Sequence, residues 1–333
     1  MIRRLGPAAV LLAVTVACFA VTPALSQGTL NLGVTMLTYL AIAQAWNVLA
    51  GYSGQVSLGA SAFVATGGYA TGLMLAHTGV SWPLAFAGAA IAATALAVLL
   101  SVPLLRLHGD YFAIGTLAIS IALQSLISNW PWAGGASGII LPVGGLPSGG
   151  KLFQVAVITA AAATGVTLYA RQSGFGLRLA AIRDNEAAAA GLGVSVYRHR
   201  LAALLVSSAI TGLAGAVVAF QFVVVSPDGI ASVNWSLNAV LMTIVGGAGT
   251  VIGPVIGVLI VYYGLTWELQ NQQTFSQVLE GILLIGVVRF APGGVWPLLC
   301  AGARRMSDSW RRDVQEPATE ALVTDDELSK DLV

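Results

Sequence analysis

The sequence predicts an all-α fold, a polytopic bundle of transmembrane helices. Of its 333 residues, 57% are hydrophobic and 9% are Asp, Glu, Lys or Arg, whereas soluble domains carry about 25% charged residues. No charged residue occurs between Leu5 and Leu105, and about a hundred residues without charge cannot form a water-facing surface. These observations exclude a soluble globular protein.

Eight apolar stretches are long enough to cross a bilayer as helices, which takes about 20 residues each. They are 7–26, 30–50, 57–76, 82–105, 111–129, 152–170, 201–225 and 274–290. A further run, 235–266, is too long for one span and is broken by glycines and Pro254. We expect a half-helix, a Gly-rich bend and a returning helix there, because unwound backbone at membrane depth needs cover. The prediction is eight full spans plus a Gly-broken hairpin, which makes eight to ten segments.

Positive charges predict the orientation, because short loops rich in Lys and Arg remain in the cytoplasm. If the 235–267 unit enters and returns on one side, the arginines flanking the spans all face the cytoplasm and only Lys151 lies outside. A single crossing would instead place the C-terminal arginines outside. We therefore expect a multi-pass membrane protein whose N and C termini are cytoplasmic.

The two ends of the chain have features of their own. The basic N-terminus, the first apolar run and residues 24–26 resemble a secretory signal peptide with its cleavage site. An uncleaved span is favoured, since the run is longer than a typical signal core. Residues 1–300 are expected to form the transmembrane domain, with a cytoplasmic segment at 171–200. The acidic residues and missing apolar period of 301–333 predict a disordered cytoplasmic tail.

Several function classes lack their sequence signals. A formal net charge of +1 without a basic, aromatic-studded cluster argues against nucleic acid as a partner. Gly145, Gly150 and Lys151 have the spacing of a phosphate-binding P-loop, but Leu152 stands where the magnesium-binding Ser or Thr belongs. The three histidines lie in different places without acids at metal-ligand spacing. We expect no enzymatic activity, no catalytic residue, no metal and no cofactor in this chain.

Ionisable residues are nearly missing from the predicted spans. Asp110 and Asp228 lie at boundaries or loops, and Glu268 and Glu280 are expected near the outer ends of their helices. Carriers driven by protons or sodium usually keep such residues inside their spans. An uncharged route indicates a neutral or zwitterionic solute and a driving force supplied by another protein.

The long cytoplasmic segment 171–200 is a candidate docking site for that partner. Its alanine run predicts a short helix with Asp184 as a possible cap and a glycine at its end. Small residues allow close approach, and charged residues form a rim. The alternative is a plain connecting loop whose arginines only fix the topology. The candidate coupling residues are Gly176, Arg178, Arg183, Asp184, Asn185, Glu186, Ala188, Ala189 and Gly193.

Two Gly-rich stretches, 51–59 and 246–257, are candidates for the solute pathway. Paired Gly- or Pro-interrupted segments in the two halves of a transporter indicate a substrate path. The alternative is that the glycines allow tight helix packing, which we favour for Gly67, Gly68 and Gly72. The candidate pathway residues are Gly54, Gln55, Ser57, Gly59, Gly246, Gly247, Gly249, Thr250 and Pro254.

Five blocks of the sequence carry a resemblance to a known family. They are Trp46 to Gly59, Arg106 to Ile114, Gly134 to Gly138, Phe175 to Val194, and Gly246 to Pro254. The blocks occur in this order over roughly residues 30–298. Through them the chain resembles the permease subunits of branched-chain amino acid ABC importers. The similarity is to the LivM-type subunit rather than to its H-type partner.

The resemblance implies a pore-forming half-transporter in the bacterial inner membrane. Its implied partners are separate ABC ATPase subunits, an H-type permease subunit and a periplasmic solute-binding protein. The chain departs from the family pattern in two places. The acidic residue usual soon after the Tyr111 block is absent, with Ser120 nearby instead, and the alanine block has Gly193 rather than the strict coupling-loop spacing. Leucine, isoleucine or valine is the expected solute. Urea or a short amide stays open, since related subunits move these, and a secondary carrier or channel is the competing class.

Overall fold

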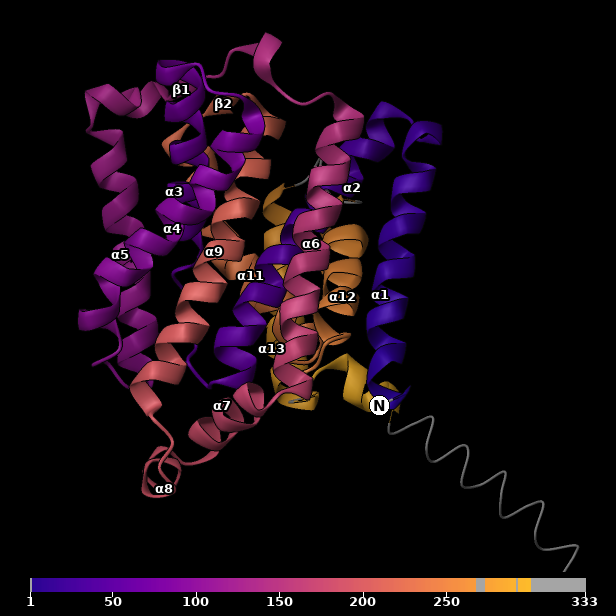
Figure 1. The fold of residues 1–333 in the computed structure, drawn as a ribbon, viewed down its shortest axis with the longest axis vertical. Coiled ribbons are helices and arrows are strands. Elements are labelled where there is room, and N and C mark those ends of the chain that lie inside the picture. Colours follow the sequence, from indigo (N-terminus) through magenta and orange to yellow (C-terminus); the bar gives the residue numbers. More distant parts are fainter. Residues whose placement is uncertain (1, 268–272, 292, 301–333) are drawn as a thin grey trace, which may run out of the picture.

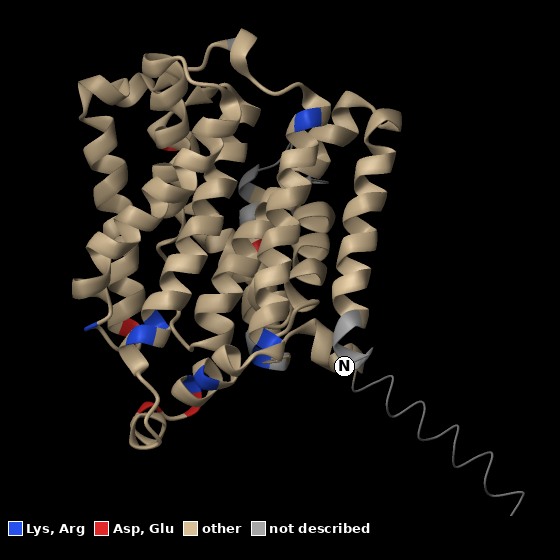
Figure 2. Ribbon diagram, in the orientation of Figure 1, with Lys and Arg blue, Asp and Glu red and all other residues tan. Residues whose placement is uncertain are grey.

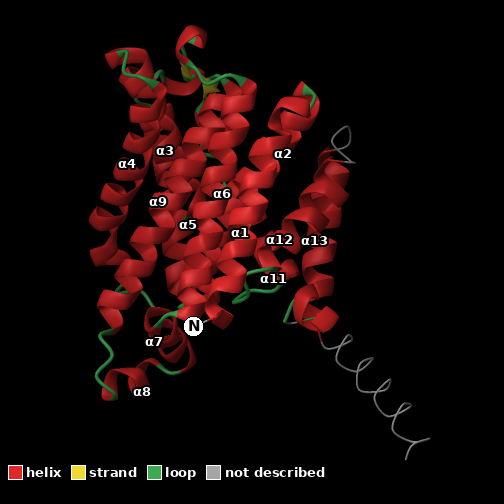
Figure 3. Cartoon of the chain, turned by 45° about the vertical axis from the view of Figure 1, so that its right-hand side comes forward, coloured by secondary structure: helices red, strands yellow, loops and turns green. Residues whose placement is uncertain are grey.

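The computed structural model describes residues 2–267, 273–291 and 293–300. Nearly all of this part is helical, and the long helices run roughly side by side (Figures 1 and 3). The fold class predicted from the sequence is confirmed. The first half of the bundle consists of α1 (Ile2–Val21), α2 (Gln27–Trp46), α3 (Ala60–Leu73), α4 (Trp82–Leu104) and α5 (Asp110–Ser128).

The second half contains longer and shorter helices. These are α6 (Gly149–Gln172), α7 (Gly174–Asp184), α8 (Glu186–Gly191), α9 (Val196–Phe222), α10 (Pro227–Ile230), α11 (Asn234–Gly246), α12 (Gly253–Val258) and α13 (Gln273–Phe290). π-Helical turns continue α2 over Asn47–Tyr52, α3 over Met74–Thr78 and α12 over Leu259–Trp267. Two short antiparallel strands, β1 (Ile139–Ile140) and β2 (Val224–Val225), pair Ile139 with Val225 at one end of the bundle.

Seven helices in the described residues are long and apolar enough to cross a membrane. They are Gly6–Ala24, Gln27–Tyr52, Trp82–Leu104, Asp110–Ser128, Gly149–Gln172, Val196–Phe222 and Pro227–Gly246. The expected count of eight full spans differs at three places, and 274–290 is one of them, because the apolar part of α13 there, Val278–Val287, is shorter than a full span. The span expected at 57–76 begins only at Ala60, because the chain before it is not helical. Residues 227–246, expected as a loop and a half-helix, are long enough to span by themselves.

The bend and the returning helix of the Gly-broken hairpin occur as predicted, whereas the first arm belongs to a stretch long enough to span. α11 descends from the β-strand end, residues 247–252 make the bend, and α12 with its π-helical turn returns against α11. Glycines allow the two helices to touch. A Cβ atom on Gly246 would overlap the Gly253 carbonyl oxygen, and one on Gly257 would overlap the carbonyl oxygen of Met242. Here the glycines of the hairpin are packing residues as well as bend residues.

Small residues also bring α3, α4 and α9 into contact at the centre. A Cβ on Gly67 would overlap the backbone of Gly212, and one on Gly68 would lie 3.2 Å from the Gly215 carbonyl oxygen. On α4, every fourth residue is a fully buried alanine: Ala85, Ala89, Ala93 and Ala97. This stripe lets α4 approach α9 closely. The packing interpretation of Gly67 and Gly68 agrees with these contacts.

The Lys and Arg residues of the described chain lie at the ends of the bundle. Figure 2 shows the Arg residues gathered at the end formed by α7 and α8, whereas the blue residue at the start of α6, Lys151, lies at the opposite end. We call the first the arginine end and the second the strand end. The bend of the hairpin lies near the arginine end, since the position of a Gly249 Cβ is 3.6 Å from Arg183 Nη1.

Candidate functional site

The first Gly-rich stretch is an unwound connection between α2 and α3. Side chains of neighbouring helices satisfy its backbone. Trp46 Nε1 donates to the Ser57 carbonyl oxygen at 2.7 Å, and the Leu58 amide donates to Thr116 Oγ1 at 2.9 Å. Ser57 Oγ accepts from the Gly59 amide at 3.1 Å. Irregular backbone is thus held inside the bundle as membrane depth requires.

Gln55 and Ser57 are buried, whereas Val56 between them is 47% exposed. Gln55 Oε1 has no hydrogen-bond partner among the described residues. Gly54 has a φ of 74°, the left-handed region that favours glycine. Gly59 packs against α5, where its Cβ would lie 3.0 Å from Thr116 Cβ. Of the four candidates in this stretch, Gln55 alone therefore presents a buried polar atom without a partner.

The second Gly-rich stretch is a turn that starts α12. Gly247 and Gly249 have φ angles of 121° and 76°. Thr250 Oγ1 donates to the Gly247 carbonyl oxygen at 2.8 Å and accepts from the Gly253 amide at 2.9 Å. Pro254 is buried near the start of α12, where its missing N–H costs no helical hydrogen bond. Thr250 and Pro254 are thus explained by the geometry of the turn.

The structure brings these two stretches together, although about two hundred residues separate them in the sequence. Asn47 Nδ2 donates to the Thr250 carbonyl oxygen at 2.7 Å, and Asn47 Oδ1 accepts from the Gly249 amide at 2.7 Å. Gln44 Nε2 donates to the Val251 carbonyl oxygen at 2.8 Å. A Cβ on Gly51 would lie 2.6 Å from the Gly249 nitrogen. We call residues 47–54 and 247–251 the glycine joint.

The segment after α6 folds into two short helices that protrude at the arginine end (Figure 1). Ser173 caps α7, and Asn185 caps α8 by accepting from the Ala188 amide at 3.0 Å. The expectation that Asp184 caps the alanine helix was wrong. Asp184 is the last residue of α7, and the extended backbone that a cap requires occurs at Asn185, with φ −159° and ψ 106°.

The charged residues of this segment differ in their surroundings. Glu186 Oε2 lies 2.8 Å from Arg200 Nη2, and its Oε1 lies 3.8 Å from His108 Nε2. The start of α8 is therefore tied to the start of α9 by an ion pair. Arg183 pairs with Asp184 at 3.0 Å and reaches the glycine joint. Arg178 is exposed.

Apolar and small residues form an exposed surface on α7 and α8. Leu177 is 74% exposed and Leu192 85% exposed, and Ala188 and Gly193 are exposed as well. Two other predicted coupling residues face inward. Ala189 is buried, and a Cβ on Gly176 would overlap the Ala170 carbonyl oxygen. Gly176 and Ala189 therefore shape the segment, and the exposed residues are available to a partner.

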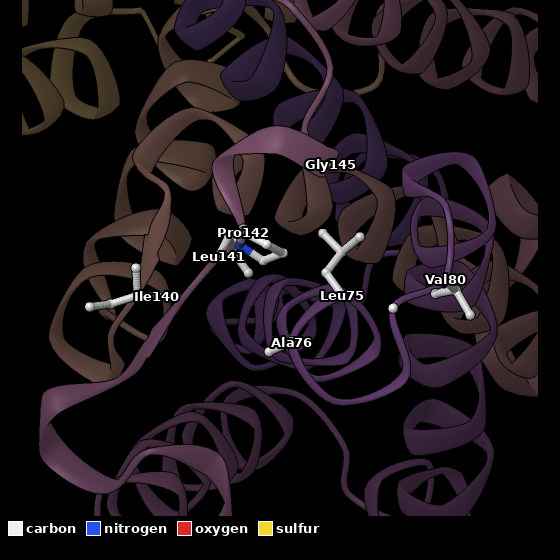
Figure 4. A pocket seen from close by; sticks show the side chains of 8 residues that line it. Leu75, Ala76, Val80, Ile140, Leu141, Pro142 and Gly145 are labelled. Carbon is white, nitrogen blue, oxygen red and sulfur yellow. The ribbon is translucent and has the colours of Figure 1, made fainter.

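A pocket of about 580 Å³ lies at the strand end, far along the bundle from the glycine joint. Figure 4 shows the apolar side chains that line it, among them Leu75, Val80, Leu141 and Pro142. None of the predicted pathway residues lines this pocket.

An aromatic cluster lies where the sequence analysis named no candidate residue. The Tyr39 ring lies 4.9 Å from that of Trp235 and 5.2 Å from that of Tyr262, and Asn238 Nδ2 donates to the Tyr39 hydroxyl at 3.3 Å. Glu280 interacts electrostatically with this hydroxyl. Glu280 is the eighth residue of α13 and thus about 10 Å into the helix, not near its outer end as expected. Glu268 lies outside the described residues.

Comparisons with known proteins now identify the kind of protein. Residues 28–288 match the model of a family described as branched-chain amino acid transport system / permease component. The chain belongs to this family. Together with the seven long apolar helices, this makes it a multi-pass membrane permease.

Three curated relatives are similar over much of the chain. The high-affinity branched-chain amino acid transport system permease protein LivM of Escherichia coli (strain K12) is 27% identical, covering 82% of this chain and 71% of that protein. The protein of the same name in Salmonella typhimurium is 26% identical over the same shares. A probable LivM permease protein of Methanocaldococcus jannaschii is 28% identical over 59% of this chain and 62% of its own length. No solved structure matches the chain significantly.

Proposed function

We propose that this chain is the LivM-type subunit of an ABC importer that takes up branched-chain or related neutral amino acids. The observation that carries the proposal is the family match over residues 28–288, supported by relatives whose names state this transport. The proposed assembly contains separate ABC ATPase subunits, an H-type permease as the other half of the pore, and a periplasmic solute-binding protein. It resides in the bacterial inner membrane.

The arginine end is proposed to face the cytoplasm. Arginines gather there, and Lys151 lies at the strand end (Figure 2), which is the asymmetry of the positive-inside rule. In this orientation the hairpin enters from the periplasmic side and returns to it. The N-terminus and the C-terminal end of α13 are then cytoplasmic, and so is the tail 301–333.

The surface of α7 and α8 is proposed to dock on the ATPase subunit. Its exposed leucines are Leu177 on α7 and Leu192 just after α8, and α8 carries small exposed residues, so a partner helix or groove can come close to the backbone of α8. The Glu186–Arg200 ion pair fixes the position of this surface relative to α9. Changing Leu192→Asp is expected to weaken co-purification of the ATPase, whereas Ile140→Asp at the strand end serves as a control of similar exposure.

The two Gly-rich stretches are proposed to line or gate the pathway on this chain's side of the pore. Gln55 Oε1 is free among the described residues to meet an ammonium group, and Arg183, which donates to the Gly51 carbonyl oxygen, is a charged group beside the first stretch. A bulky residue at Gly247 or Gly249, where φ is positive, is expected to abolish uptake. If uptake persisted, these glycines would serve packing only.

Reconstitution tests the proposed function directly. The chain is placed in liposomes with candidate H-type permease, ATPase and binding-protein subunits encoded by neighbouring genes. Uptake of labelled leucine is then measured with and without ATP. ATP-dependent leucine uptake that needs every partner is expected. Uptake by the chain alone, without ATP, would identify a carrier or channel. A binding protein that bound urea and ignored leucine would replace the solute but keep the importer.

A further inference from the structure

One arginine of the protruding segment contacts the first part of the glycine joint and lies close to the second. Arg183, in the last turn of α7, donates from Nη1 to the Gly51 carbonyl oxygen at 2.8 Å. Its aliphatic stem covers Gly54, where an added Cβ would lie 2.7 Å from Arg183 Cγ. The same Nη1 lies 3.6 Å from the Cβ position of Gly249. Arg183 thus links α7 to the place where α2 meets the hairpin.

The guanidinium is held from both sides. Asp184 Oδ1 accepts from Arg183 Nε at 3.1 Å and pairs with Nη2 at 3.0 Å. The Gly51 carbonyl lies near the C-terminal end of the helix formed by α2 and its π-helical turn, where unpaired carbonyl groups favour a cation. This leaves Nη1 for the joint while Nε and Nη2 stay with α7.

Movement of α7 therefore has a direct route into the hairpin. α7 is anchored in the bundle by the buried residues Leu179 and Ile182, which precede Arg183 by four residues and by one residue. From Gly51 the connection continues through Asn47, which binds both Gly249 and Thr250. The connection from α7 to the bend consists of the Arg183–Gly51 hydrogen bond, the π-helical turn that carries both Gly51 and Asn47, and the hydrogen bonds of Asn47 to the bend.

We propose that Arg183 is the internal coupling residue of this permease and transmits displacement of the α7–α8 segment to the glycine joint. The proposal rests on the proposed function, because the displacement is taken to come from a docked ATPase. It changes the role given to Arg183 by the sequence, where it formed part of the rim that meets the partner. Arg183 acts within this chain, and the docking surface lies on other residues.

The test compares three variants in the reconstituted complex. Arg183→Ala removes the link, and Arg183→Lys keeps the charge and one donor but not the fork shared with Asp184. Arg198→Ala, an exposed arginine near the start of α9, controls for loss of positive charge at the same end. Co-purification of the ATPase, ATP hydrolysis, leucine uptake and thermal unfolding are measured for each.

We expect Arg183→Ala to lower uptake at least tenfold while ATPase co-purification and hydrolysis stay within about twofold of the unaltered complex. In Arg183→Ala the number of leucine molecules moved per ATP hydrolysed falls. Arg183→Lys keeps part of this ratio, and Arg198→Ala leaves the ratio unchanged. An unaltered ratio in Arg183→Ala would overturn the proposal. Loss of the ATPase from the complex would return Arg183 to the docking surface, and a large fall in unfolding temperature would make its role structural. If the unaltered complex moved no leucine with ATP, the proposed function itself would fail first.

Discussion

The two hydrogen bonds of Asn47 give a sharp test of how the glycine joint is held together. Asn47 is fully buried and pairs with the Gly249 amide and the Thr250 carbonyl at 2.7 Å each. Asn47→Leu preserves the number of side-chain heavy atoms but leaves both backbone groups without this partner. Side-chain hydrogen bonds between membrane helices contribute about 0.6 kcal/mol on average and up to about 1.7, and an unpaired buried group costs about 1–3 kcal/mol. We expect a loss of about 2 kcal/mol in unfolding free energy.

Gln44→Leu is the informative comparison, because Gln44 lies one turn earlier and makes one bond to the same bend. It loses the bond to the Val251 carbonyl but also removes Oε1, which is buried without a partner among the described residues. These effects oppose each other, so the expected change is close to zero. Asn129→Leu, at an exposed position after α5, controls for the Asn-to-Leu exchange.

Thermal unfolding in detergent measures these differences, and an unfolding free energy follows where the transition is reversible. For Asn47→Leu, about 2 kcal/mol corresponds to a fall of about 4–8 °C in the midpoint for a domain of 150–250 residues, and to somewhat less for this longer chain. Equal midpoints for Asn47→Leu and Gln44→Leu would refute the reasoning that Asn47 joins α2 to the hairpin.

Three further predictions concern packing and topology. Gly257→Ala should lower the free energy of unfolding by up to about 3 kcal/mol, because the added methyl group overlaps a backbone carbonyl. Gly281→Ala on α13, with open space around it, should be neutral or stabilising. Equal unfolding midpoints for the two variants would contradict this. The hydroxyl groups of Ser61 and Ser236 lie 3.0 Å apart in the core, and a double-mutant cycle on the two should give a coupling free energy of about 0.6 kcal/mol. A coupling near zero would show that this hydrogen bond does not stabilise the fold. In a chain without native cysteines, a cysteine at Ala188 should react only from the cytoplasmic side and one at Gly144 only from the other, and the reverse pattern would invert the orientation.

The long helices could be predicted from the sequence because spanning a bilayer is a local requirement. About 20 apolar residues without charge suffice to define a span, and the ranges predicted for α2, α4 and α6 fall within a few residues of the observed helices. The hairpin could be predicted for a related reason, since glycines and Pro254 interrupt an apolar run that is too long for one crossing. The predicted start of α3 lies three residues early, because residues 57–59 are uncharged and continue into the apolar run of the helix.

The contacts of the candidate site could not be predicted in the same way, because they join residues far apart in the chain. Gln44 and Asn47 lie in an apolar span, and nothing nearby in the sequence indicates that their amides bind the bend some two hundred residues later. The sequence did contain one signal for these contacts, which is the need of a buried polar group for a hydrogen-bond partner. A buried amide in a span must find a partner, and two glycines with positive φ must expose backbone groups that need one.

Arg183 shows most clearly that composition and spacing predict the region in which a residue lies but not where its side chain points. By the positive-inside rule it only marks a cytoplasmic loop, and by its place beside Asp184 it belongs to a charged rim. Its direction is decided by the position of α7 beneath the end of α2, which follows from the burial of Leu179 and Ile182, and by the missing side chains of Gly51 and Gly54. Any Cβ at Gly54 would meet the stem of Arg183. The glycines needed for the bend are therefore also what gives the arginine access to it, and this is why one short stretch of sequence serves both the joint and its link to α7.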